Sequence, residues 1–177
     1  MRSSLIYAFL AIALATPQPA PAQTAMAGMD APKPPSTPST SLALTVDGKT
    51  TTFTVAELKA MPQKSVSVHN EHTKADETYA GVPLSDLLAK AGFLATKATQ
   101  RKMLRSYLRV EGTDKYWVLY SLTEVEPTEH TGEVIVATSV DGKSLGADGE
   151  LKLVSSGDTK PQRWVRNLSA ITLQAAQ

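Results

Sequence analysis

The sequence contains no cysteine among its 177 residues. This excludes disulfide bonds, thiolate zinc sites, iron–sulfur clusters, haem attached through CxxCH, a thiol nucleophile and a lipid anchor on cysteine. An excess of charge of one sign is also lacking, because 18 Lys and Arg residues nearly balance 17 Asp and Glu residues. Proteins that bind nucleic acid through its phosphates carry a basic excess, so we expect no nucleic-acid partner.

Long hydrophobic runs are absent except near the N-terminus. Arg2 precedes an apolar run over residues 5–15, and the Ala-Pro-Ala of residues 20–22 follows it. This order is typical of a secretory signal peptide, and the run is shorter than the about 20 residues that a membrane-spanning helix needs. We expect cleavage after Ala22, or alternatively after Ala27. The mature protein would then be periplasmic, with no stable membrane anchor.

The composition changes after the leader. Residues 23–41 are rich in Pro, Ser, Thr and Ala and show no apolar period, which predicts a semi-extended linker. We therefore expect a signal peptide over 1–22, a linker over 23–41 and one folded domain over 42–177. Within that domain, β-prone runs are interspersed irregularly with short helical patterns. This favours the α+β class, with a strand-rich mixed sheet and short helices, over a doubly wound sheet.

Local signals place the individual elements. Asp47-Gly48 between two β-prone runs predicts a hairpin over 42–53. Thr54 and Glu57 form a capping box that starts a short helix ending before Pro62. The other expected elements are a strand over 65–69, a polar loop over 70–78, a helix from 81 to 92, a second hairpin over 104–121, and strands over 133–138, 151–154 and 168–173.

Four segments stand in a recognisable order: FTVAELKAMP (53–62), YAGVPLSDLLAKAG (79–92), VATSVDGKSL (136–145) and GELKLV (149–154). Together they resemble the small relatives of the sulfite-oxidase-type molybdopterin-binding domain, and RWVRNLSAI (163–171) fits that family's closing strand. The resemblance spans most of the expected domain. It implies a sulfite-oxidase-like molybdopterin-binding fold.

The chain departs from that family at two functional positions. Catalytic members ligate molybdenum through a cysteine thiolate, and the corresponding stretch here, VHNEH (68–72), contains no sulfur. The family's His-Gly-x-Pro-x-Arg turn beside the pterin phosphate is replaced by DGELK (148–152). Asp148 and Glu150 would repel a phosphate, and Lys152 lacks the bidentate fork of arginine. The resemblance therefore implies a binding or accessory module rather than an oxidase.

The first candidate site would bind an anionic ligand through basic side chains, with His69 and Asn70 as neighbours of a metal. For a flat anionic ligand such as a pterin pyrophosphate, the resemblance and the local chemistry suggest His69, Asn70, Lys152, Lys160, Arg163 and Arg166. Trp164 would stack on such a ligand. The competing interpretation is a surface loop that leads into a strand, with Trp164 in the core and the cations outside.

A second candidate site is His69-x-x-His72, near Glu71, Asp76 and Glu77. Imidazoles and carboxylates bind zinc or copper. Histidines three residues apart share a face on a helix, whereas His69 is expected to end a strand. Two solvated histidines in a polar loop are therefore the competing interpretation.

We expect a periplasmic binding or accessory module whose partner is a small anionic ligand or a periplasmic protein. We expect no bound cofactor, and the resemblance makes molybdopterin the one to test. Arg2 stands alone in the leader, whereas proteins that take up molybdopterin before export usually carry a twin-arginine pair. Two alternatives stay open: a molybdopterin-dependent oxidoreductase without a protein thiolate, and a divalent-metal protein using His69 and His72.

Overall fold

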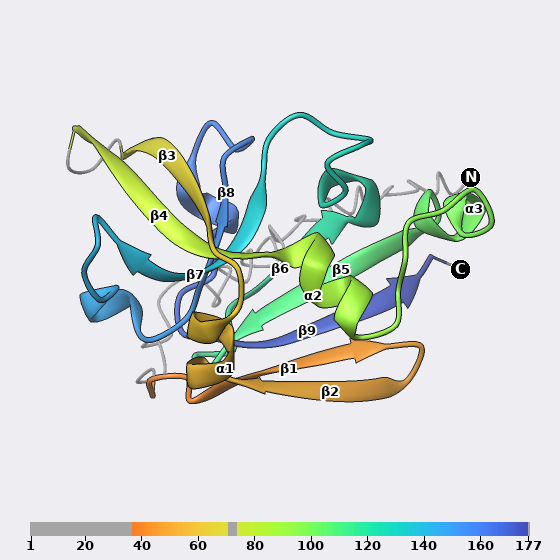
Figure 1. The fold of residues 1–177 in the computed structure, drawn as a ribbon, viewed down its shortest axis with the longest axis horizontal. Helices are drawn as coiled ribbons and strands as arrows, with labels where there is room; N and C mark the ends of the chain where they lie inside the picture. Colours follow the sequence, from red (N-terminus) through yellow and green to blue (C-terminus); the bar gives the residue numbers. More distant parts are fainter. Residues whose placement is uncertain (1–36, 71–73, 177) are drawn as a thin grey trace, which may run out of the picture. The chain divides into compact units, whose positions relative to one another are not determined.

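The computed structural model describes residues 37–70 and 74–176, whose strands form two sheets (Figure 1). The five-stranded sheet has the order β2-β1-β9-β5-β6, with β1 Ser41–Val46, β2 Lys49–Thr54, β5 Ser106–Gly112, β6 Trp117–Ser121 and β9 Leu168–Ala175. The four-stranded sheet has the order β3-β4-β7-β8, with β3 Lys64–Asn70, β4 Ala75–Pro83, β7 Val134–Val140 and β8 Lys152–Ser155. β1 and β9 are parallel, and the other neighbours are antiparallel.

The helices between these strands are short. They are α1 Val55–Ala60, α2 Leu84–Lys90 and α3 Gln100–Met103, with 3-10 turns η1 Leu122–Glu124, η2 Gly146–Asp148 and η3 Pro161–Arg163. The predicted strand-rich α+β class is confirmed. The sequence predicts one mixed sheet, whereas the structure has two. None of the helices in the described part of the chain has the length and apolarity needed to cross a membrane.

The first hairpin and the first helix form as predicted. Asp47 and Gly48 have positive φ angles of 51° and 78°, and they join β1 to β2 so that Val46 pairs with Lys49. Thr54 N–H donates to Glu57 Oε2 at 2.7 Å, and Glu57 N–H donates to Thr54 Oγ1 at 3.2 Å. This reciprocal pair satisfies amides that the first turn of α1 leaves without helical partners.

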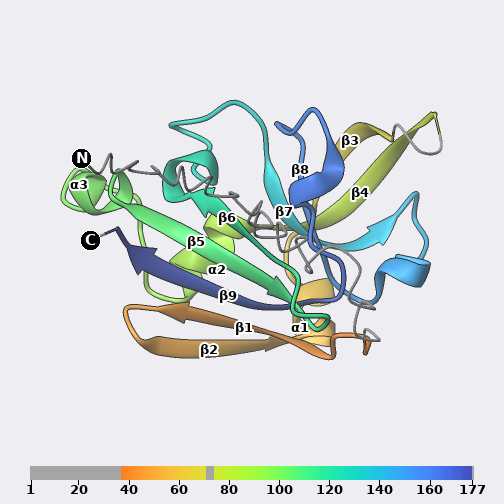
Figure 2. The same cartoon turned by 180° about the vertical axis from the view of Figure 1, so that it is seen from behind.

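The prediction of a polar loop over 70–78 is wrong. β4 begins at Ala75 and pairs with β3, so that His69 faces Asp76 and Val66 faces Tyr79. The outer part of this hairpin is largely exposed, and it projects toward one corner of the domain in Figures 1 and 2. A strand exposed on both faces needs no apolar alternation, which is why its polar sequence is typical of a loop.

Two hydrophobic clusters lie on opposite faces of the four-stranded sheet. In β7, Val134 and Val136 belong to the larger cluster, whereas Ile135 and Ala137 belong to the smaller one. A strand buried on both faces has a continuous apolar sequence. The smaller cluster also contains Trp164 and Tyr79, whose rings meet edge to face with centroids 5.9 Å apart.

Glu126 is a buried carboxyl, 8% exposed, on the segment that follows η1. Burial, and then the charges of Glu129 and Asp86, raise the pKa of Glu126 above its usual 4.5. The folded state therefore holds this proton more tightly than the unfolded chain does. Ionising Glu126 thus lowers stability as the pH rises from about 4.5 through the raised pKa.

We expect Glu126→Gln to raise the free energy of unfolding at pH 7. The gain should nearly disappear at pH 4, below the usual pKa of 4.5, where the wild-type carboxyl is mostly protonated in both states. Urea denaturation at the two pH values measures this difference. Glu129→Gln, at an exposed position, is the control and should give a smaller gain. An equal gain from Glu126→Gln at both pH values would contradict the assignment.

Candidate functional site

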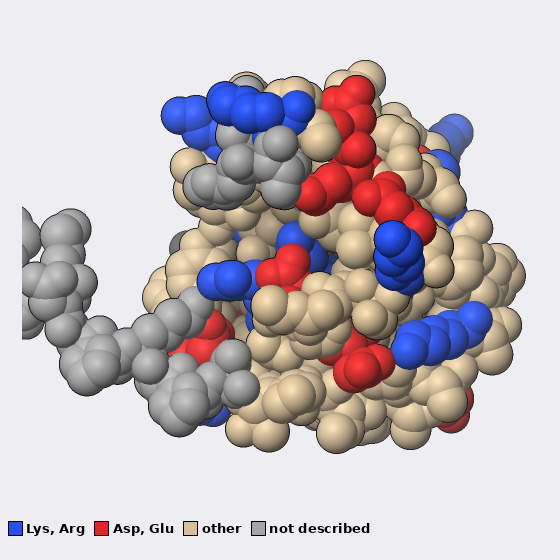
Figure 3. Space-filling model, turned by 90° about the vertical axis from the view of Figure 1, so that its left-hand side faces the viewer, with Lys and Arg blue, Asp and Glu red and all other residues tan. Residues whose placement is uncertain are grey.

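A cavity of about 470 Å³ lies where the η2 turn, β8 and the segment after β8 meet the end of β3 and the β5–β6 turn. It is lined by Asn70, Asp114, Tyr116, Asp148, Lys152, Pro161, Gln162, Trp164 and Arg166. This volume is typical of sites for small organic molecules. Figure 3 shows a face of the domain on which basic and acidic side chains are intermixed around a depression.

Lys152 brings a buried cation to this cavity. The residue is 7% exposed, and its Nζ donates to Asp148 Oδ2 at 2.6 Å and to Tyr79 Oη at 3.0 Å. The ammonium also lies 4.7 Å from the ring centroid of Tyr79 and 5.5 Å from that of Trp164. An ammonium has three N–H donors, so one donor of Lys152 has no acceptor within the described residues.

Arg166 adds a second cation, whose guanidinium donates no hydrogen bond within residues 37–70 and 74–176. Its side chain is 55% exposed, and its Nη1 lies 3.7 Å from Asp148 Oδ1, too far for a hydrogen bond. Backbone contacts fix the three charges: Asn167 N–H donates to Asp148 O at 2.9 Å, and Lys152 and Arg166 form an isolated β-bridge. Asp148 is therefore held between Lys152 and Arg166.

Trp164 lines the cavity with its ring and has a buried polar atom. Its Nε1 is buried and has no hydrogen-bond partner in the part of the chain that the structure describes. Leaving a buried N–H without an acceptor is costly. Tyr116, also in the cavity lining, connects the β5–β6 turn to the segment after β8, because its hydroxyl donates to Gln162 O at 2.5 Å.

A chain of hydrogen bonds connects Lys152 to the β3–β4 hairpin. Tyr79 Oη accepts from Lys152 and donates to Glu77 Oε2 at 2.8 Å, while Asn70 Nδ2 donates to Glu77 Oε1 at 2.7 Å. Burial, together with the hydrogen bond to Glu77, raises the pKa of Tyr79 far above its ordinary value. Tyr79 therefore stays neutral at physiological pH and keeps both roles in this chain.

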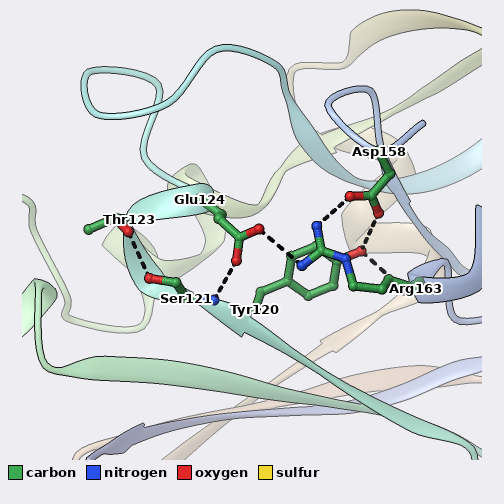
Figure 4. A network of polar contacts seen from close by, with 6 residues as sticks. All are labelled: Tyr120, Ser121, Thr123, Glu124, Asp158 and Arg163. Atoms are coloured by element: carbon green, nitrogen blue, oxygen red, sulfur yellow. Dashed lines mark hydrogen bonds and ion pairs between the residues drawn. The ribbon is translucent and has the colours of Figure 1, made fainter. Parts of the chain in front are cut away.

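Arg163 lies in a separate network (Figure 4). Its Nη1 donates to Glu124 Oε1 at 3.0 Å, and its Nη2 donates to Asp158 Oδ1. Its guanidinium carbon lies 4.3 Å from the ring centroid of Tyr120, whose hydroxyl donates to Arg163 O at 3.1 Å. Although burial lowers it, the hydrogen bonds to Asp158 and Glu124 raise the pKa of Arg163 above its ordinary value.

The structure thus places half of the six predicted ligand residues around the cavity. Asn70, Lys152 and Arg166 line it, whereas His69, Lys160 and Arg163 are not among the lining residues. Sequence reasoning missed Asp114, because its place in the turn Gly112-Thr113-Asp114 indicates only a turn residue. Its carboxylate accepts from Tyr116 N–H at 3.1 Å.

The predicted metal pair is described only in part. His69 Nδ1 lies 2.8 Å from Asp76 Oδ1 on the exposed hairpin, whereas His72 lies outside the described residues. Within residues 37–70 and 74–176, no group of three or more His, Asp or Glu side chains is arranged to hold a metal ion.

No protein-family model and no curated protein matches this sequence. Among solved structures, the chain is similar to the sulfane dehydrogenase SoxCD from Paracoccus pantotrophus, with a TM-score of 0.59 and 20% sequence identity. The match covers 76% of this chain and 38% of that chain. At this identity the match shows a shared fold alone, over less than half of that chain's length.

Proposed function

We propose that this chain is a periplasmic, non-catalytic binding or accessory module that holds a small anionic ligand in the cavity. The observation that carries the proposal is the convergence of two cations on one cavity: Arg166 and Lys152, each with N–H donors that have no acceptor among the residues the structure describes. Donors of this kind bind carboxylate and other oxyanion groups. The fold similarity supports a distant relationship to an oxidoreductase component.

The residues around the cavity do not fit molybdopterin. The chain offers no thiolate for molybdenum. Lys152 and Arg166 already face Asp148, and Arg163 is bound by Glu124 and Asp158 outside the cavity lining. A phosphate dianion would therefore meet the carboxylate of Asp148 among the cations that should bind it. This misfit favours binding without the cofactor.

Benzoate is a suitable probe for the proposed site. We expect it to bind the mature protein and to shift the indole N–H signal of Trp164 in an NMR titration. Arg166→Gln should weaken the binding about tenfold, because it removes a charge-assisted hydrogen bond. Lys160→Gln is the matched control, since it removes a positive charge outside the lining and should leave binding unchanged.

The sample should be the full chain exported with its own leader from a Gram-negative host that makes molybdopterin. N-terminal sequencing should find cleavage after Ala22 or Ala27. Molybdenum and pterin, measured on the same sample, should stay well below one per chain. Either group near one per chain, or no benzoate binding, would contradict the proposal.

A further inference from the structure

Asp148 fixes the charge of the anion site. Its Oδ2 lies 2.6 Å from Lys152 Nζ and its Oδ1 lies 3.7 Å from Arg166 Nη1. Two positive charges and one negative charge leave this triad with a net charge of +1. Asp114 lines the same cavity, so the charges of the lining residues that the structure describes sum to zero.

This arrangement discriminates between ligands by their charge. A single negative group can accept from Arg166 and from the third N–H of Lys152 while Asp148 keeps its own contacts. A second negative charge on the ligand would find no further cation among the described lining residues and would lie close to Asp148. Because Lys152 is buried, solvent screens this repulsion less than it would at the surface.

The volume and the lining residues of the cavity indicate which kind of organic body the anionic ligand carries. About 470 Å³ is far more space than an inorganic anion fills. Tyr116, Pro161 and Trp164 provide flat or apolar walls, and the amides of Asn70 and Gln162 provide polar groups. The planar guanidinium of Arg166 matches the two oxygens of a carboxylate.

We propose that the cavity selects small organic molecules with one carboxylate, and that Asp148 is the residue that rejects doubly charged anions. The proposal rests on the anion-binding function proposed above and names its ligand class. It departs from what a phosphate-binding site requires, because Asp148 limits the net charge available to the ligand.

A size-matched pair of probes tests the selectivity of the wild-type protein. Isophthalate carries two carboxylates at pH 7, and 3-carbamoylbenzoate has nearly the same shape with one carboxylate and one neutral amide. At constant ionic strength, calorimetry should show 3-carbamoylbenzoate binding at least about tenfold more tightly than isophthalate. Nitrate, a planar monoanion without an organic body, should also bind at least about tenfold more weakly.

The variant Asp148→Asn tests the role of the carboxylate. It keeps an oxygen acceptor for Lys152 and removes the negative charge, so the affinity for isophthalate relative to 3-carbamoylbenzoate should rise about tenfold. Glu150→Gln is the matched control. It removes a charge two positions away, outside the lining, where Glu150 pairs with Lys59 at 3.2 Å. This control should leave the affinity ratio unchanged.

The outcomes test the selectivity for monocarboxylates separately from the proposed anion-binding function. If wild-type protein binds isophthalate as tightly as 3-carbamoylbenzoate, the selectivity is wrong and the anion site stands. If nitrate binds as tightly as 3-carbamoylbenzoate, the organic ligand class is wrong. Binding of none of these probes would overturn both proposals. A folded Asp148→Asn protein with an unchanged ratio would overturn the role of Asp148, and the wild-type panel remains decisive if that variant does not fold.

Discussion

Replacing Gly81 by alanine is expected to lower the free energy of unfolding by about 3 kcal/mol or more. A Cβ atom at this position would lie 2.2 Å from Val136 O and 2.5 Å from Ala137 Cα. Both are backbone atoms of β7, which pairs with β4 here beside a register shift between Ala80 and Gly81. Relief of this clash would require the two central strands of the four-stranded sheet to separate.

Chemical denaturation followed by circular dichroism measures the loss. Gly157→Ala is the control, because its Cβ would lie 3.2 Å from His130 Cε1 and 3.3 Å from Thr131 O, and shifts of a few tenths of an ångström relieve both contacts. The change should therefore stay within about 1 kcal/mol. Chain entropy alone would favour alanine at Gly81 by about 0.5–1 kcal/mol. A Gly81→Ala protein as stable as the wild type would therefore contradict the close approach of the strands.

Elements that depend on short-range chemistry could be predicted from the sequence. The turn at Asp47-Gly48 needs two residues that tolerate positive φ, and the capping box needs Thr54 and Glu57 three positions apart. β4 could not be predicted, because the pairing of its polar half with β3 compensates for weak apolar patterning. The division into two sheets depends on contacts between distant strands, such as β1 and β9.

The candidate site, like the fold, could be predicted from the sequence only in part. Lys152 can be proposed from the family resemblance, and Arg166 from the cations around Trp164, but sequence reasoning gives Asp148 only the role of repelling a phosphate. The structure shows Asp148 accepting a hydrogen bond from Lys152. This contact needs the η2 turn and β8 to fold against each other. Nor does sequence spacing indicate that Arg163 meets Glu124, 39 positions away.

The network around Arg163 gives the second large effect. Arg163 is 37% exposed, whereas its partner Asp158 is only 8% exposed. Exposed ion pairs contribute up to about 1 kcal/mol, and breaking buried pairs costs about 3–5 kcal/mol. We therefore expect Arg163→Gln to lower the free energy of unfolding by about 2 kcal/mol, because Asp158 is left without its counter-charge and Tyr120 loses the guanidinium packed on its ring.

A second substitution separates the charge effect from lost packing. In the Arg163→Gln background, Asp158→Asn should recover about half of the lost stability, because it removes the orphaned charge and retains an acceptor for Tyr120. Arg101→Gln, on the exposed surface of α3, is the control and should change stability by less than about 0.5 kcal/mol. Urea denaturation of the wild type, the two single variants and the double variant measures these differences in the free energy of unfolding. An Arg163→Gln loss no larger than that of Arg101→Gln, or a double variant less stable than Arg163→Gln, would contradict a buried ion pair at this position.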